Sequence, residues 1–385
     1  MNRRHCAIAT LTLTVCFWSA GARGQARGAT GPAAPTTSTT RAASTAIAAP
    51  VTVPPQAYTS PAANRAVIVN FVTLNVTNLL NDSDTAAQTN ARNNLTAATS
   101  TAGAPASPTF LFEYAMALNN AFTPKLAPKA NSSVRQRLNM AIVTARVAYA
   151  AQNVALQATT IQLINDPAEP VVLWGLKAAQ PQMPLILTMK KGAVPPMLAA
   201  IKPAVFKHPS GPVFAEAYEA LTAVDPLVVK ELIALWGNRL SQYQGKEPPD
   251  DPAVDGRPVF ALTTAGMWKT VVTNKTLQTQ VMQMISDQTA VSAEWADQTP
   301  AGDKHDQLVK LMVQCAGGCV VVGTNQKIPA LVAAATPTAG IRVETLPAGT
   351  KVLPMVSPGL IAAINAAFPG VQPPPPVGAA AKAAP

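Results

Sequence analysis

Apolar side chains between residues 134 and 149 recur at the spacing of one helix face, and the residues between them are polar or charged. This spacing predicts an amphipathic helix that buries the apolar stripe. Residues 131–133 (Asn-Ser-Ser) supply N-caps for it, and Asp166-Pro167 supplies a break after it. The stripe consists of Val134, Leu138, Ala141, Ile142, Ala145, Ala148 and Tyr149.

The helical period continues along most of the chain, whereas no run of alternating Val, Ile and Thr is long enough for a sheet. We therefore predict an all-α fold, built as an irregular array of helix pairs or as a helical bundle. A small hairpin of residues 319–322 and 341–356 remains an alternative. The other predicted helices are 62–80, 84–99, 108–122, 170–180, 184–190, 194–205, 212–222, 226–243, 259–272, 275–295, 304–315, 328–335 and 358–367.

Two segments of the chain are alike. Residues 79–84 and residues 163–167 both run from two apolar residues through Asn-Asp into a predicted helix, about 84 residues apart, or two repeats of about 42. The second, continued to residue 179, resembles the second half of a HEAT-type helical repeat. The resemblance covers roughly residues 62–240, and it implies stacked helix pairs that offer a continuous binding surface without a catalytic cleft.

The N-terminus has the organisation of a secretory signal peptide. Residues 1–22 combine a basic start, an apolar stretch over residues 7–18 and small residues at 20–22 where cleavage would occur. We expect the mature chain to begin at Arg23 and to be exported, with a periplasmic, cell-surface or extracellular location. Two alternatives remain, namely an uncleaved membrane anchor and a lipoprotein signal at Cys16.

Composition divides the rest of the chain into five parts. Residues 23–60 are rich in Ala, Thr, Ser and Pro, and residues 372–385 contain a run of four prolines, so both predict disordered segments. Residues 244–258 are loaded with Pro, Asp and Gly and predict an exposed loop or linker. It would separate a HEAT-like helical domain, 61–243, from a second helical region, 259–371. The acids of this loop lack calcium-loop spacing.

Charge excludes some partners. After loss of residues 1–22 the 29 basic residues fall to 27 against 19 acidic ones, a charge of about +8. No basic run interleaved with aromatic residues occurs, which argues against nucleic acid, although attachment to an anionic envelope polymer remains an alternative. After signal cleavage we expect no membrane span, since Asn70, Asn75 and Asn78 interrupt the best apolar stretch, 66–80.

Two cysteines, Cys315 and Cys319, remain after cleavage and flank Ala-Gly-Gly. In an oxidising compartment this pair predicts a disulfide, formed if a helix ends at Cys315 and the glycines turn the chain back. Alternatives are a redox-active pair and a zinc site. The three-residue spacing is unusual for redox pairs, and zinc would have to recruit His305 and Asp306.

No catalytic motif is present. The only histidines after cleavage, His208 and His305, lie outside metal-binding doublets, and we expect them to be solvent-exposed or capping residues. Serine-hydrolase elbows, dinucleotide loops and phosphate loops are missing. A glycosidase needs only two carboxylates, and Glu216 and Glu219 share a predicted helix face, although a solvated pair is the ordinary explanation for them.

The sequence therefore predicts an exported envelope binding or scaffolding protein that acts through contacts with another envelope protein. We assign no catalytic, cofactor-binding or metal-binding residue and expect no cofactor. The alternatives are a carboxylate-dependent, carbohydrate-active envelope enzyme and attachment to an anionic polymer. A desolvated acid pair in a cleft would favour the enzyme, and an extended groove would favour the binding protein.

Overall fold

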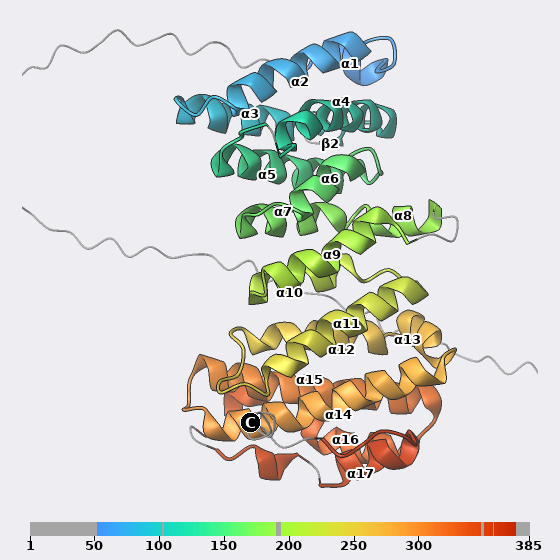
Figure 1. Cartoon of the computed structure of the whole chain (residues 1–385). Coiled ribbons are helices and arrows are strands. Elements are labelled where there is room, and N and C mark those ends of the chain that lie inside the picture. The colour runs from blue at the N-terminus through green and yellow to red at the C-terminus, as the bar shows by residue number, and fades with distance from the viewer. Residues whose placement is uncertain are drawn as a thin grey trace, which may run out of the picture. The chain divides into compact units, whose positions relative to one another are not determined.

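The computed structural model describes residues 52–101, 104–128, 130–189, 194–347, 350–356 and 358–374. Within these residues the chain forms seventeen α-helices, three short 3₁₀ helices and one pair of two-residue strands (Figure 1). The predicted all-α fold is confirmed. The predicted signal peptide, most of the N-terminal linker and residues 375–385 lie outside the described residues.

The N-terminal half contains eleven helices and the strand pair. The helices are α1 (Pro55–Thr59), α2 (Arg65–Leu79), α3 (Thr85–Ala97), α4 (Pro108–Leu126), α5 (Val134–Ala151), α6 (Gln157–Ile164), α7 (Glu169–Ala179), α8 (Met183–Met189), α9 (Pro196–Lys207), α10 (Gly211–Ala220) and α11 (Pro226–Gln242). Strands β1 (Ser100–Thr101) and β2 (Ala104–Pro105) pair antiparallel between α3 and α4.

The C-terminal half contains six α-helices, of which α14 and α15 are the longest, and the three 3₁₀ helices. They are η1 (Pro252–Asp255), α12 (Gly256–Thr263), α13 (Ala265–Val272), α14 (Lys275–Gln298), α15 (Asp303–Gln326), α16 (Pro329–Ala339), η2 (Val343–Thr345), η3 (Leu353–Met355) and α17 (Pro358–Ala367).

Helix α5 does not bury the whole predicted stripe, since Val134 and Tyr149 are about half exposed and Asn139, outside the stripe, is buried. Local sequence nevertheless sets the ends of this helix. Ser133 and Gln136 form a capping box, in which each side chain accepts a hydrogen bond from the backbone N–H of the other. The helix stops at Gln152, whose φ of 44° is left-handed. The next helix, α6, precedes the break at Asp166 and was not predicted, because its Gln- and Thr-rich sequence has a weak apolar period.

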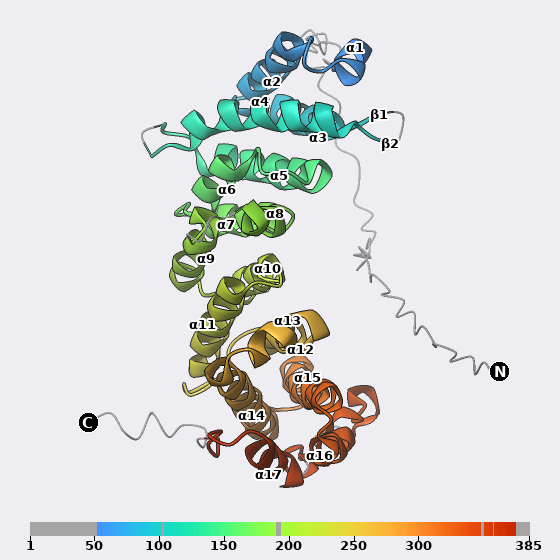
Figure 2. The same ribbon diagram turned by 90° about the vertical axis from the view of Figure 1, so that its right-hand side faces the viewer.

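Successive helices pack against one another in chain order, and the core has two main apolar clusters. In the first half α2 packs on α3 and α4, α4 on α5, α5 on α7, and α7 on α10 (Figures 1 and 2). One cluster runs from Val53 to Leu156 and includes Ala178, and the other runs from Ile164 to Val371. The core therefore continues without a break across residues 244–258.

The segment 244–258 is only partly the exposed loop that its composition predicts. Asp251 has a left-handed φ of 53° and leads into η1, which continues directly into α12. Asp255, at the end of η1, is completely buried. Composition misled the prediction because an acidic residue can be buried where a cation meets it.

Three other local features differ from what the sequence suggested. The alternative hairpin is not formed: residues 319–322 lie inside α15, and the described part of 341–356 contains η2 and η3 in place of a strand. The single helix expected over 259–272 is two helices, because Thr264 has extended ψ of 147° between α12 and α13. Helix α1 also falls within 23–60, which was expected to be disordered.

One described helix, α15, is long and apolar enough by length and composition to cross a membrane. Its most apolar window is 56% buried inside the protein. It packs against α12, α14 and α16, which is the environment of a core helix.

Candidate functional site

A hollow of about 680 Å³ lies where the end of α10, the whole length of α12 and the middle of α15 meet. We call it hollow A. Most of its lining is apolar, and Phe260 is 75% exposed within it. A large aromatic side chain left in water over a concave surface is typical of a surface that binds a partner. Residues that line hollow A include Tyr218, Glu219, Gly256, Phe260, Gly317 and Val321.

A second hollow, of about 510 Å³, adjoins the first. We call it hollow B. It lies over the C-terminal ends of α5, α7 and α10 and the start of α8, and these helices follow one another in Figure 2. Because Glu219 and Thr222 line both hollows, the two form one groove that extends from α5 to α15. The other residues of hollow B are Tyr149, Gln152, Gln180, Pro181, Pro184 and Leu185.

Glycines allow the helices beneath hollow A to approach closely. A Cβ atom at Gly318 would lie 2.8 Å from Cγ1 of Val259, so α12 could not pack on α15 as it does with any larger residue there. Gly317, the next residue, has no neighbouring atom within 4 Å of where a Cβ would lie. A side chain at position 317 would therefore extend into open space at the wall of hollow A.

Ion pairs mark the junction of the two hollows. Glu219 lies 3.1 Å from Nη1 of Arg257, and both side chains are about half exposed. One turn earlier on α10, Glu216 lies 3.7 Å from Nζ of Lys177 on α7. The junction is thus polar, in contrast to the apolar floor of hollow A.

A chain of hydrogen bonds connects three helices along hollow B. The hydroxyl of Tyr149 on α5 donates to Oε1 of Gln180 at the end of α7. Nε2 of Gln180 in turn donates to Oε2 of Glu216 on α10 at 2.7 Å. Partial burial, and then the negative charges of Glu216 and Glu219, raise the pKa of Tyr149. The negative charge of both carboxylates is therefore felt at Tyr149, on this edge of the groove.

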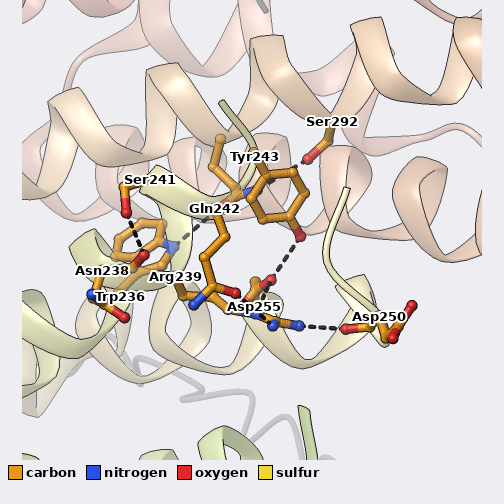
Figure 3. Close-up of polar contacts among 10 residues, drawn as sticks. Trp236, Asn238, Arg239, Ser241, Gln242, Tyr243, Asp250, Asp255 and Ser292 are labelled. Carbon is orange, nitrogen blue, oxygen red and sulfur yellow. Dashed lines mark hydrogen bonds and ion pairs between the residues drawn. The ribbon is translucent and has the colours of Figure 1, made fainter. Parts of the chain in front are cut away.

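A buried ion pair fixes the backbone segment that enters hollow A. Nε of Arg239, in the last turn of α11, lies 3.2 Å from each carboxylate oxygen of Asp255, and Tyr243 donates to Oδ2 at 2.6 Å (Figure 3). Arg239 also donates to the backbone oxygen of Asp250. Because Asp255 directly precedes Gly256 and α12, these bonds hold the start of α12 against α11.

The environment of Asp255 shifts its titration. Burial raises its pKa to about 6, while the charge of Arg239 and the hydrogen bonds from Tyr243 and Arg239 act in the opposite direction. Burial, followed by the charge of Asp255, also raises the pKa of Tyr243 well above its usual value. The pair is sealed from solvent, so its role is to position the groove and not to meet a substrate.

Tyr218 lies between the ion pair and the groove. Tyr218 lines hollow A and is 1% exposed, and its hydroxyl has no hydrogen-bond partner among the described residues. Burial and then the charge of Asp255 raise its pKa well above the usual value. An unpaired buried hydroxyl is unfavourable, so a bound partner or a water that reached it would gain a hydrogen bond.

The predicted cysteine turn is absent. Helix α15 continues through Gly317 and Gly318, and Cys315 and Cys319 lie one helical turn apart, fully buried and free, so the structure does not contain the expected disulfide. Gly318 allows the close contact with α12, and neither glycine reverses the chain. Burial raises the pKa of Cys319 to about 12 and that of Cys315 well above its usual value, unlike a reactive thiol.

The histidines are not brought together. His305 lies in the first turn of α15, is only 5% exposed and contacts Asp306 at 3.0 Å, so the expectation that it is solvent-exposed is wrong. His208 is the C-cap residue of α9, as a capping role predicts. In the described part of the chain no group of three His, Cys, Asp or Glu residues could hold a metal ion.

Sequence reasoning found part of the site. Glu216 and Glu219 lie one turn apart on α10, as predicted, but only Glu219 lines the groove, and each of the two meets a cation from another helix. The apolar part was missed because Phe260 belongs to the continuous apolar run 258–262, in which the sequence does not show which side chains face the core. One sequence feature could have revealed this part of the site. The pair Gly317-Gly318 lies inside a strongly helical pattern, where glycines can mark a close contact between helices as well as a turn.

No protein-family profile matches the chain, and no curated protein or solved structure is significantly similar to it.

Proposed function

We propose that this protein is exported to the cell envelope, where it binds another protein through the groove and serves as a binding or scaffolding component. The observation that carries the proposal is hollow A, in which Phe260 stands 75% exposed above an apolar floor. The predicted signal peptide, residues 1–22, supports a partner outside the cytoplasm.

The dimensions of the groove suit a polypeptide segment. A volume of about 680 Å³ can take large side chains, and covering an aromatic ring is worth about 1.5–3 kcal/mol. The groove also continues into hollow B, so it crosses several helices from Tyr149 to Val321. An extended chain can follow such a path, as peptides do on the surfaces of stacked helix pairs.

The carbohydrate-active alternative has less support. A glycosidase needs two carboxyl groups that face a cleft, one to donate a proton and one to act as base or nucleophile. Glu216 and Glu219 are each held by a cation, and Asp255 is enclosed by Arg239 and Tyr243. These contacts favour binding over catalysis.

Two substitutions at one position test the proposal. Gly317→Leu places a large side chain in hollow A, whereas Gly317→Ala is the matched control that leaves most of the hollow open. Both replace a helical glycine, so neither should destabilise α15. Residues 23–385 of each form would be immobilised, incubated with envelope extract and washed at low and high salt, and bound polypeptide and polysaccharide would be analysed.

We expect the native protein and Gly317→Ala to retain the same discrete polypeptide at high salt, and Gly317→Leu to lose it. Retention of that polypeptide by Gly317→Leu would contradict a role for the groove. Recovery of polysaccharide alone would contradict the protein-binding proposal, with salt-sensitive recovery indicating an anionic polymer.

A further inference from the structure

Three helix C-termini meet at hollow B. Helix α5 ends at its C-cap Gln152, α7 ends at its C-cap Gln180, and α10 ends just before Thr222, and all three residues line the hollow. The last carbonyl groups of a helix lack partners within the helix, and each C-terminus carries about −0.5 of an elementary charge. Hollow B therefore has a concentration of hydrogen-bond acceptors.

Acidic side chains add to these acceptors in an unusual position. Glu219 lies in the last turn of α10 and Glu216 lies three residues before it, although the C-terminal end of a helix favours cations. The last turn of α10 contains no basic residue. Lys177 and Arg257, from other helices, each balance one of the two carboxylates.

The remaining charge is negative. Once the two cations cancel the two carboxylates, the three helix C-termini contribute about −1.5 of an elementary charge at hollow B and the N-terminus of α8 about +0.5, which leaves about −1. Among the described residues that line the two hollows, Arg257 is the only Lys or Arg. Arg146 lies three residues before Tyr149 but lines neither hollow. The whole chain, by contrast, has a formal charge of +10.

The walls of hollow B also suit a long aliphatic stem. Pro181, Pro184 and Leu185 provide apolar lining, and Glu219 and Thr222 provide polar groups in the same hollow. Lysine and arginine side chains have this character, since their methylene stems pack on apolar surface while their charged ends reach acceptors. A carboxylate in the same place would meet carbonyl groups and carboxylates and would be repelled.

We propose that the groove selects a polypeptide segment in which a Lys or Arg side chain lies next to a large apolar side chain. The apolar side chain enters hollow A against Phe260 and Val321, and the basic side chain enters hollow B. Because Glu219 and Thr222 line both hollows, the two side chains come from positions close together in the segment. This inference rests on the proposed binding function and adds the chemistry of the partner.

Selection from a display library of short random peptides tests this inference. The library is first depleted on Gly317→Leu, and peptides that bind the native protein are then collected and sequenced. We expect enrichment of Lys or Arg beside Phe, Leu, Ile or Met. For the strongest peptide, replacing its basic residue with Gln is expected to weaken binding about tenfold, the effect of losing one charge-assisted hydrogen bond.

A variant of the protein separates charge from apolar contact. Glu219 is 48% exposed in its side chain, so Glu219→Gln should fold normally, which its thermal unfolding would check. We expect Glu219→Gln to reduce the preference for the basic peptide over its Gln counterpart while the apolar preference remains.

The outcomes distinguish the two proposals. Groove-dependent peptides that are enriched only in apolar residues, or that carry Asp or Glu beside them, would overturn the basic preference and leave the binding function standing. The absence of any peptide that needs an open hollow A would contradict the binding function, and this inference would fall with it.

Discussion

The N-terminal and C-terminal halves each contain an Arg–Asp pair that joins a helix to the start of a later one, but the two pairs differ in burial. Nε of Arg137 on α5 lies 2.7 Å from Oδ2 of Asp166, and the two side chains are 17% and 5% exposed. The Arg239–Asp255 pair is 3% and 0% exposed. Burial changes what the same contact contributes to stability. Removing one partner of a fully buried ion pair leaves an uncompensated charge in the core and lowers the free energy of unfolding strongly, whereas the more exposed pair contributes modestly.

The two pairs also support different surfaces. Asp166 caps the turn before α7, where its Oδ1 accepts from the N–H of Ala168 at 2.8 Å. Asp255 immediately precedes Gly256, and the start of α12 forms a wall of hollow A. We infer that the fully buried pair is the one that maintains the groove, which gives the comparison a functional consequence.

The sharpest way to test the comparison is to remove each arginine. Arg239→Met leaves the Asp255 carboxylate buried without its cation, and we expect the free energy of unfolding to fall by about 3–5 kcal/mol near neutral pH. Arg137→Met leaves a carboxylate that is nearer to solvent, with an expected loss of about 1–2 kcal/mol. Urea unfolding of the two variants measures both, and equal losses would contradict the assignment of different roles.

The pH dependence of stability isolates Asp255. Because its pKa is raised from 3.8 to about 6, the native state binds a proton more tightly than the unfolded state between these values. Its contribution to stability is therefore fully present below about pH 4 and is lost as pH rises through about 6, by about 3 kcal/mol in total. Asp255→Asn lacks this group.

Unfolding of the native protein and Asp255→Asn across this pH range measures the difference between them, in which the other titrating groups cancel. We expect the native protein to lose stability relative to Asp255→Asn as pH rises from about 4 to about 6, and no further change above about 7. A difference that stays constant with pH would show that Asp255 does not titrate in this range.

Substitution of the neighbouring glycines Gly317 and Gly318 is expected to change stability less than removal of Arg239, and in opposite directions. Gly318→Ala forces a Cβ atom to within 2.8 Å of Val259, and we expect a loss of about 1–3 kcal/mol from overpacking of α12 on α15. Gly317→Ala meets no neighbour and should gain about 1 kcal/mol from helix propensity. Thermal unfolding compares them, and a gain from Gly318→Ala would contradict the close packing beneath hollow A.

The sequence predicts the helices well where apolar period and caps agree. Ser133 and the stripe after it locate the start of α5, and the range 358–367 matches α17. Helix α6 was not predicted because tertiary contacts stabilise it and the spacing of its apolar residues is weak. Thr159 and Thr160 are buried and form hydrogen bonds with Asn119 and Gln182 respectively. Contacts of that kind involve residues far apart in sequence and have no local signal.

The groove is harder to predict because its parts are ambiguous one by one. Gly317-Gly318 fits a turn and a close helix contact equally, and only the position of Val259 decides between them. Asp255 belongs to a Pro- and Asp-rich segment that resembles a solvated linker until Arg239 is placed beside it. Glu216 and Glu219 could be grouped from helical spacing, but their cations come from other helices.

The central claim is that the groove formed by hollows A and B, and not apolar surface in general, binds the partner. A photo-crosslinking phenylalanine analogue can replace Phe260, in hollow A, or Phe112 on α4, which is 46% exposed in the other half. After irradiation with envelope extract, we expect the analogue at Phe260 to form one discrete crosslinked polypeptide and the analogue at Phe112 to form none. Equal crosslinking at both positions, or a discrete product only at Phe112, would contradict the account.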